Sequence, residues 1–283
     1  MTVGTESERS LPPFEPEHGS AGRSVLVLVA LVLLVASLVP PVATEARRYE
    51  VAEAIQFCLF VVAIPALLVL GAPWRRLGLA VRHPPPPDDE GATATAVASW
   101  PPVDRLAQGR RRHPEVWRTV AFFGLYLVGA VLWRTPPAVN GLARHPWLVV
   151  VEALTLVPVG MGLWLELVES PPLTPRLSRP HRVALAAVSM WLIWVLAYLV
   201  GLSHASWYHA YIHHPGSGLS LSADQQLTTG MMWFISGCAF IPVVFWNLVR
   251  WLQSEEDPDE ELHRLVRQER IRGRTVEGGP AAP

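Results

Sequence analysis

Six long runs of apolar residues constrain this chain more than any other feature of its sequence. Each run is close to the roughly 20 residues that a helix needs to cross the hydrocarbon of a bilayer. Hydrophobic residues make up 51% of the chain, which is too apolar for an ordinary soluble domain. The predicted spans are 24–43, 51–74, 117–133, 146–168, 182–203 and 228–251. We therefore expect an all-α, polytopic membrane protein that folds as a bundle of about six transmembrane helices.

The arginines predict how this bundle is oriented. The chain has no lysine, and its arginines gather in alternate connections between the apolar runs. If the N-terminus is cytoplasmic, the arginine-rich segments are the loop of about 75–116, the connection with Arg176 and Arg179, and the tail 252–283. Short cytoplasmic loops carry an excess of arginine and lysine. Both termini are therefore predicted to be cytoplasmic.

The segments outside the spans divide the chain into three parts. Residues 1–23 are acidic and proline-containing, so they are predicted to be a disordered cytoplasmic tail and not a signal peptide. Residues 24–251 form the predicted transmembrane domain, whose loop of about 75–116 is rich in proline and arginine. Residues 252–283 form a second cytoplasmic tail, where Asp257 and Pro258 favour the start of a short helix.

The last apolar run follows an unusual polar helix start. Ser222, with Gln225 three residues later, predicts a capping box that begins the helix. Helical spacing predicts that a carboxylate, a hydroxyl, a thioether and a thiol share one stripe. That stripe contains Asp224, Thr228, Met231, Ile235 and Cys238. Helix capping by Asp224 and ordinary packing of Met231 and Cys238 are the alternative interpretations.

The predicted orientation brings polar residues of the second, fourth and sixth spans toward the same outer side. Glu53 and Gln56 lie near the start of the second span, and Glu152 lies about two turns into the fourth. The outer connections hold half of the histidines, among them His204 and His209. A carboxylate exposed to lipid costs several kcal/mol, so the two glutamates are expected to face protein or water. If the three helix starts are adjacent, they enclose an outward-facing polar cavity.

The donors in this predicted cavity suit a metal ion. Imidazole and carboxylate suit Cu(II) or Zn(II), whereas thioether and thiol suit Cu(I). The candidate ligands are Glu53, Glu152, Asp224, Met231, His204 and His209, and the remaining polar lining is Gln56, Gln225, Gln226 and Trp233. No His-x-x-x-His pair on a predicted helix accompanies them, so interfacial acids and exposed loop histidines remain the alternative. The chain has no phosphate-binding loop, nucleophile elbow or zinc-protease motif, and we expect neither catalytic residues nor an enzyme.

One stretch of the last span carries a family resemblance. Asp224-Gln225-Gln226 is followed by Gly230 and then by Met232-Trp233. This stretch resembles the CtaG family of cytochrome c oxidase assembly factors, whose last region has the pattern DQQ-x-x-x-G-x-MW. Gln56 with Pro65, His145-Pro146 with Glu152, and Trp207-Tyr208 with Tyr211 also resemble the family. The resemblance covers about 47–256.

The resemblance implies a membrane-embedded assembly factor for haem–copper oxidase in the bacterial plasma membrane. Its implied partners are oxidase subunits and the lipid bilayer, with no nucleic acid, and its implied cofactor is copper. The family pattern has His-x-x-Gln-His in the second span and His-x-x-Glu-His in the fourth, and the family commonly has seven spans. This chain has Glu53 and Phe57, then Val149 and Ala153, at the four histidine positions.

Two other functions are compatible with the sequence. A small-solute or metal-ion transporter or channel would use the same outer cluster as its vestibule, because ionisable groups in membranes mark transport pathways. A structural subunit that associates with an oxidase without binding metal would keep the fold and lose the histidines.

Overall fold

The described part of this computed structural model is a bundle of helices. It covers residues 20–75, 116–170, 173, 175–202, 207–211 and 219–255, to which all structural statements below refer. The longer helices are α1 (Ser20–Leu38), α3 (Glu50–Cys58), α4 (Ile64–Gly71), α6 (Val116–Trp133), α8 (Leu148–Leu167), α9 (Arg179–Gly201) and α10 (Leu221–Glu255). Shorter elements are α2 (Val42–Glu45), the π-helical turn η1 (Leu59–Ala63), η2 (Pro73–Arg75), α7 (Pro136–Arg144) and η3 (His209–Tyr211). The described residues contain no strand, which confirms the predicted all-α class.

The number of spans agrees with the prediction. Five helical segments are long and apolar enough to cross a membrane, and α6 with α7 makes a sixth that bends by 64°. The bend follows from the sequence Thr135-Pro136-Pro137, because proline cannot continue the hydrogen bonds of α6 but fits the first turn of a new helix. Most of the predicted tails and of the loop 75–116 lies outside the described residues.

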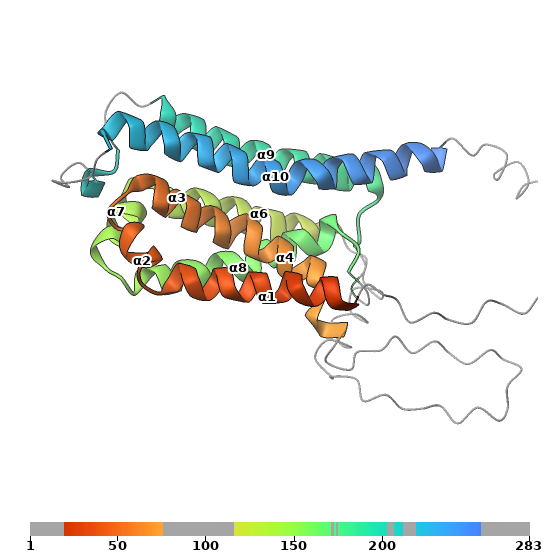
Figure 1. The fold of residues 1–283 in the computed structure, drawn as a ribbon. Helices are drawn as coiled ribbons and strands as arrows, with labels where there is room; N and C mark the ends of the chain where they lie inside the picture. The colour runs from red at the N-terminus through yellow and green to blue at the C-terminus, as the bar shows by residue number, and fades with distance from the viewer. Residues whose placement is uncertain are drawn as a thin grey trace, which may run out of the picture.

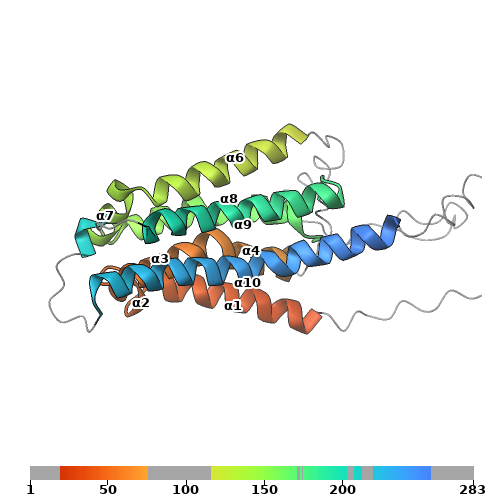
Figure 2. The same ribbon diagram turned by 90° about the horizontal axis from the view of Figure 1, so that it is seen from above.

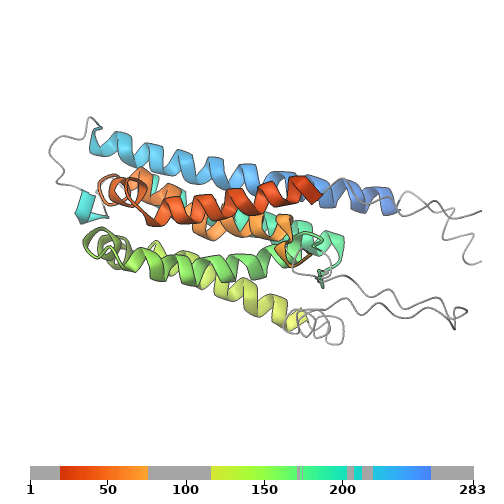
Figure 3. The same cartoon turned by 60° about the horizontal axis from the view of Figure 1, so that its bottom comes forward.

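The helices run side by side, and both described ends of the chain lie at one end of the bundle (Figure 1). At the opposite end, which we call the α7 end, α2, α7 and η3 lie at the same end of the bundle as the starts of α3, α8 and α10. Seen from above, α10 crosses over α3 and α4 beside α9 (Figure 2). Figure 3 shows α1 on one side of this layer and α6 with α8 below it. The second, fourth and sixth spans, which start with α3, α8 and α10, thus begin at the same end of the bundle, as predicted.

A close contact at the centre fixes α4 against α8. A Cβ atom added to Gly160 would lie 2.6 Å from the Pro65 ring and 2.9 Å from the Val61 carbonyl. Pro65 has no N–H to donate to that carbonyl, and the π-helical turn just before it accommodates the interruption. Gly160 therefore fits where the helix backbone is irregular, and the apolar core continues on both sides of this contact.

The polar start of α10 differs from the prediction in two ways. The helix begins at Leu221, and the Ser220 hydroxyl accepts the Ala223 N–H at 3.2 Å, so the predicted capping box of Ser222 and Gln225 is wrong. The buried stripe also departs from the predicted one after Asp224 and Thr228, which the two share. It contains Asp224, Thr228, Met232, Ser236 and Phe240, whereas Met231 is half-buried and Cys238 is exposed. A spacing of four follows the ridge that helices use when they pack.

Candidate functional site

Asp224 caps a helix, but not its own. Its two carboxylate oxygens accept the backbone N–H groups of Glu50 and Val51, each at 2.9 Å. These are the first residues of α3, and the preceding residue, Tyr49, gives no side-chain cap. A carboxylate at this position satisfies free N–H groups and interacts favourably with the positive end of the helix dipole. Asp224 therefore fastens α10 to the start of α3.

One turn into α3, Glu53 forms a buried ion pair with Arg134. Arg134 Nη1 donates to Glu53 Oε2, and both side chains are only 2% exposed. Arg134 comes from the corner between α6 and α7. Its guanidinium lies 5.3 Å from the ring centroids of both Phe57 and Tyr208. The arginine is thus held between two aromatic faces, an arrangement that is strongest when water is excluded.

Two tyrosines close the α7 end over this pair. The Tyr208 hydroxyl donates to the Arg134 carbonyl and the Tyr211 hydroxyl donates to the Ala46 carbonyl, both at 3.0 Å. Burial raises the pKa of Tyr208 to about 12, against the opposing effect of the Arg134 charge. Burial also raises the pKa of Tyr211 well above its usual range. Both phenols therefore stay neutral at physiological pH and keep the protons they donate.

The cluster holds more carboxylates than cations. Glu50, Glu53 and Glu152 are each at most 2% exposed, and Arg134 is the guanidinium among them. Neither carboxylate oxygen of Glu152, nor Arg134 Nε or Nη2, has a hydrogen-bond partner among the described residues. One guanidinium cannot neutralise three buried carboxylates, and an isolated buried charge is strongly unfavourable. The cluster therefore has a capacity for protons beyond the Glu53–Arg134 pair.

The space beside the cluster is small. A cavity of about 10 Å³ is bordered by Glu53 and Gln56 of α3 and by Val149 of α8, which is about the space that one water molecule needs. Gln56 does not point its amide into an open chamber, because Nε2 donates to the Ser37 carbonyl at 2.5 Å. The described residues bring the predicted acids together without enclosing a large vestibule.

Of the other predicted site residues, those that the structure describes contact α9, are half-buried or are exposed. Gln225 Nε2 donates to the Val200 carbonyl of α9 at 2.5 Å. Trp233 stacks on Trp194 with ring centroids 5.1 Å apart. Gln226 and His209 are exposed, Met231 is half-buried, and His204 lies outside the described residues. Within the described ranges, no three His, Cys, Asp or Glu side chains are placed to hold a metal ion.

Arg134 is the residue that sequence reasoning missed. It directly follows the third predicted span, at its outer edge, where the positive-inside rule disfavours an arginine. A buried acid needs a partner, and a lone arginine at the same predicted depth as Glu53 is the signal that could have identified it.

The comparison with protein families gives one match. The family described as cytochrome c oxidase caa3 assembly factor (Caa3_CtaG) matches residues 9–254 of the chain. The chain has no significant match among the curated proteins or among the solved structures.

Proposed function

Because the chain belongs to the family of cytochrome c oxidase caa3 assembly factors, we propose that it assists the assembly of a haem–copper oxidase in a bacterial plasma membrane as a binding protein without catalytic turnover. The observation that carries the proposal is the family match over 9–254, which includes all the described spans. A multi-pass membrane protein is in the right compartment to contact oxidase subunits while they insert.

The described cluster does not fit a copper ion. Glu53 is paired with Arg134, and both oxygens of Asp224 accept backbone N–H groups. The two positions where the family pattern places second-span histidines hold Glu53 and Phe57, and both contact the Arg134 guanidinium. A cationic side chain at this place opposes a second cation by charge repulsion. The proposed function therefore includes no copper step at this cluster.

Copper binding by the six candidate ligands remains a prediction with a direct test. Purified full-length protein is titrated with Cu(I) and with Cu(II), beside the Glu152→Gln variant. An affinity that Glu152→Gln weakens would support a site at the cluster. An affinity no tighter than that of a scrambled histidine peptide would remove it.

The assembly function is tested by deleting the gene. We expect lower haem–copper oxidase activity and less assembled oxidase in membranes, with both restored by the wild-type gene. Normal oxidase activity together with normal copper content of the oxidase would contradict the proposal. Stable co-purification with an oxidase without any assembly defect would instead favour a structural subunit.

A transport function receives less support from the arrangement of polar groups. The buried acids gather at the α7 end, and the buried Glu166 at the opposite end is held by Arg176, whose Nη1 and backbone N–H donate to it at 3.0 Å. Between these ends the described core is apolar and includes Phe60, Leu163 and Trp164. A solute path would have to cross this apolar layer, so flux in proteoliposomes is expected to be absent.

A further inference from the structure

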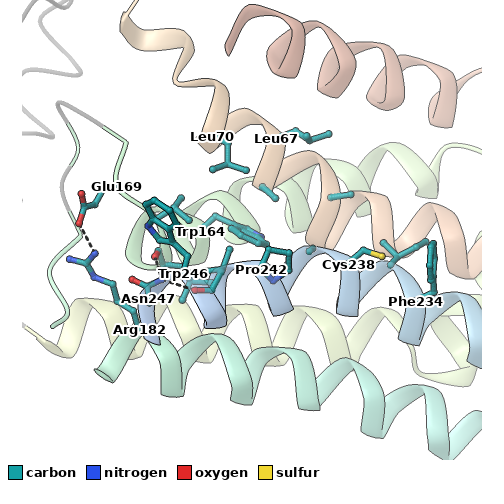
Figure 4. A pocket seen from close by; sticks show the side chains of 17 residues that line it. Leu67, Leu70, Trp164, Glu169, Arg182, Phe234, Cys238, Pro242, Trp246 and Asn247 are labelled. Carbon is teal, nitrogen blue, oxygen red and sulfur yellow. Dashed lines mark hydrogen bonds and ion pairs between the residues drawn. The ribbon is translucent and has the colours of Figure 1, made fainter. Parts of the chain in front are cut away.

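An apolar groove opens at the side of the bundle, between α4, α8 and α10, away from the acidic cluster. Its volume is about 820 Å³, within the range of small-molecule sites. Leu67 and Leu70 line it from α4, and Phe234 and Trp246 line it from α10 (Figure 4). The Phe234 and Trp246 side chains are also largely exposed. Because α4 and α10 belong to membrane spans, the groove opens toward the hydrocarbon of the bilayer.

The groove exists because small side chains and a proline lie where α10 leaves its neighbours. Ala66 and Ala239 leave space between the facing helices. Pro242 lacks the N–H that would bind the Cys238 carbonyl, and both residues line the groove. Trp164 also lines it, and its buried indole N–H has no acceptor among the described residues. The walls are therefore apolar but retain isolated polar atoms.

The polar side chains of the groove gather at one end. Figure 4 shows Glu169, Arg182 and Asn247 near Trp246, with Phe234 at the far end. Arg182 Nη1 lies 3.1 Å from Glu169 Oε1, and Arg179 Nη2 lies 3.5 Å from the same oxygen. The Arg250 guanidinium lies 4.8 Å from the centroid of the Trp246 ring. Two guanidinium groups thus meet one carboxylate, and a third lies over Trp246, which lines the same groove, so positive charge is in excess among the described residues.

We infer that this groove binds an anionic phospholipid, with one acyl chain along the apolar wall and the phosphate at the arginine end. Guanidinium groups bind phosphate through paired hydrogen bonds, and basic sites between membrane helices on the cytoplasmic side bind anionic head groups. This end belongs to the side predicted to be cytoplasmic. The charge asymmetry, together with an apolar wall, matches a lipid that is anionic at one end.

The test compares phosphatidylglycerol with zwitterionic phosphatidylcholine on full-length protein in mild detergent, with bound lipid counted by native mass spectrometry. One basic side chain near a membrane surface corresponds to about fivefold in affinity. We expect phosphatidylglycerol to bind at least about fivefold tighter, and Arg182→Gln to lower its affinity by about fivefold. Arg48→Gln removes an exposed arginine from the turn between α2 and α3, which does not line the groove, and is expected to leave the preference unchanged. Equal affinity for the two lipids would overturn the inference.

The groove itself is tested by filling it. Ala239→Trp is expected to reduce phosphatidylglycerol binding to background, whereas Ala121→Trp, on an exposed face of α6, is expected to leave it unchanged. Unchanged binding in Ala239→Trp would place the lipid elsewhere and refute the site. Thermal unfolding of each variant shows that it is folded.

Cys238 provides a readout that needs no substitution. Its thiol is exposed in the groove, whereas Cys58 is buried, so maleimide alkylation of folded protein reports on Cys238. Phosphatidylglycerol is expected to slow this alkylation more than phosphatidylcholine does. Equal alkylation rates with both lipids would contradict occupancy of the groove by lipid. Protection of Cys238 that arises from dimerisation of the protein without lipid would contradict it as well.

Discussion

The Glu53–Arg134 pair gives the sharpest test of the acidic cluster. In Arg134→Gln the cation is lost, and Glu53 remains in a site where its side chain is 2% exposed. Removing one partner of a buried ion pair lowers the free energy of unfolding by about 3–5 kcal/mol. The contacts of the guanidinium with Phe57 and Tyr208 are lost as well. We therefore expect a loss at the upper end of this range.

A double-mutant cycle separates the buried charge from ordinary packing. Glu53→Gln in the Arg134→Gln background removes the uncompensated carboxylate, so the double variant is expected to be more stable than Arg134→Gln alone by about 2–3 kcal/mol. Unfolding is measured for purified protein in mixed micelles with increasing denaturing detergent, followed by circular dichroism. The two single variants and the double variant complete the cycle with the wild-type protein.

The exposed pair of Arg48 and Glu45 is the matched control. Its atoms are 3.4 Å apart, but the side chains are 60% and 44% exposed. Exposed pairs contribute about 0–1 kcal/mol, so Arg48→Gln is expected to change stability by less than 1 kcal/mol. If Arg134→Gln proves equally mild, or if Glu53→Gln gives no rescue, the cluster is hydrated and the reasoning from burial is refuted.

Three further substitutions test other contacts. Asp224→Ala removes the cap of α3 and is expected to lower the free energy of unfolding by about 0.5–2 kcal/mol. Ser222→Ala is the control and is expected to leave stability unchanged. Equal effects of the two substitutions would show that the cap across the two helices is unimportant. Gly160→Ala is expected to destabilise by about 1–3 kcal/mol, because its Cβ would meet a ring carbon of α4 at 2.6 Å. Gly124→Ala, with nothing within 4 Å, is its neutral control, and similar melting temperatures for both would contradict this packing. Tyr208→Phe leaves a buried carbonyl without its donor, so we expect the free energy of unfolding to fall by about 1–3 kcal/mol. The ultraviolet difference spectrum between wild type and this variant is expected to show one phenol that titrates near pH 12. Titration near pH 10 would show that Tyr208 is hydrated.

Two acids of the buried cluster could be selected from sequence because polar residues in membrane spans have few options. A carboxylate in an apolar run must face protein, water or a partner. That rule selected Glu53 and Glu152, and the structure buries both in one cluster. The rule does not say which partner is chosen. Arg134 stands outside the apolar runs, so only the fold of the α6–α7 corner shows that it reaches Glu53.

The role of Asp224 could not be decided from local sequence either. A carboxylate near a helix start predicts a cap for that same helix, but this one caps α3, which begins 174 residues earlier in the chain. The buried stripe on α10 departs from the predicted one for a related reason. Spacings of three and four both fit a helix, and only the neighbouring helices determine which ridge is buried.

By itself, the sequence determined that this chain forms a bundle of about six membrane-spanning helices. It also determined that spans two, four and six, which carry acids near their starts, begin at the same end of the bundle. Hydrocarbon imposes these features, because it demands long apolar helices and alternating directions of crossing. The tertiary structure decided which side chains neutralise one another and where the bundle leaves space. Those outcomes depend on contacts between residues far apart in the chain, such as Glu53 with Arg134 and Pro65 with Gly160, and sequence periodicity carries no information about such pairs.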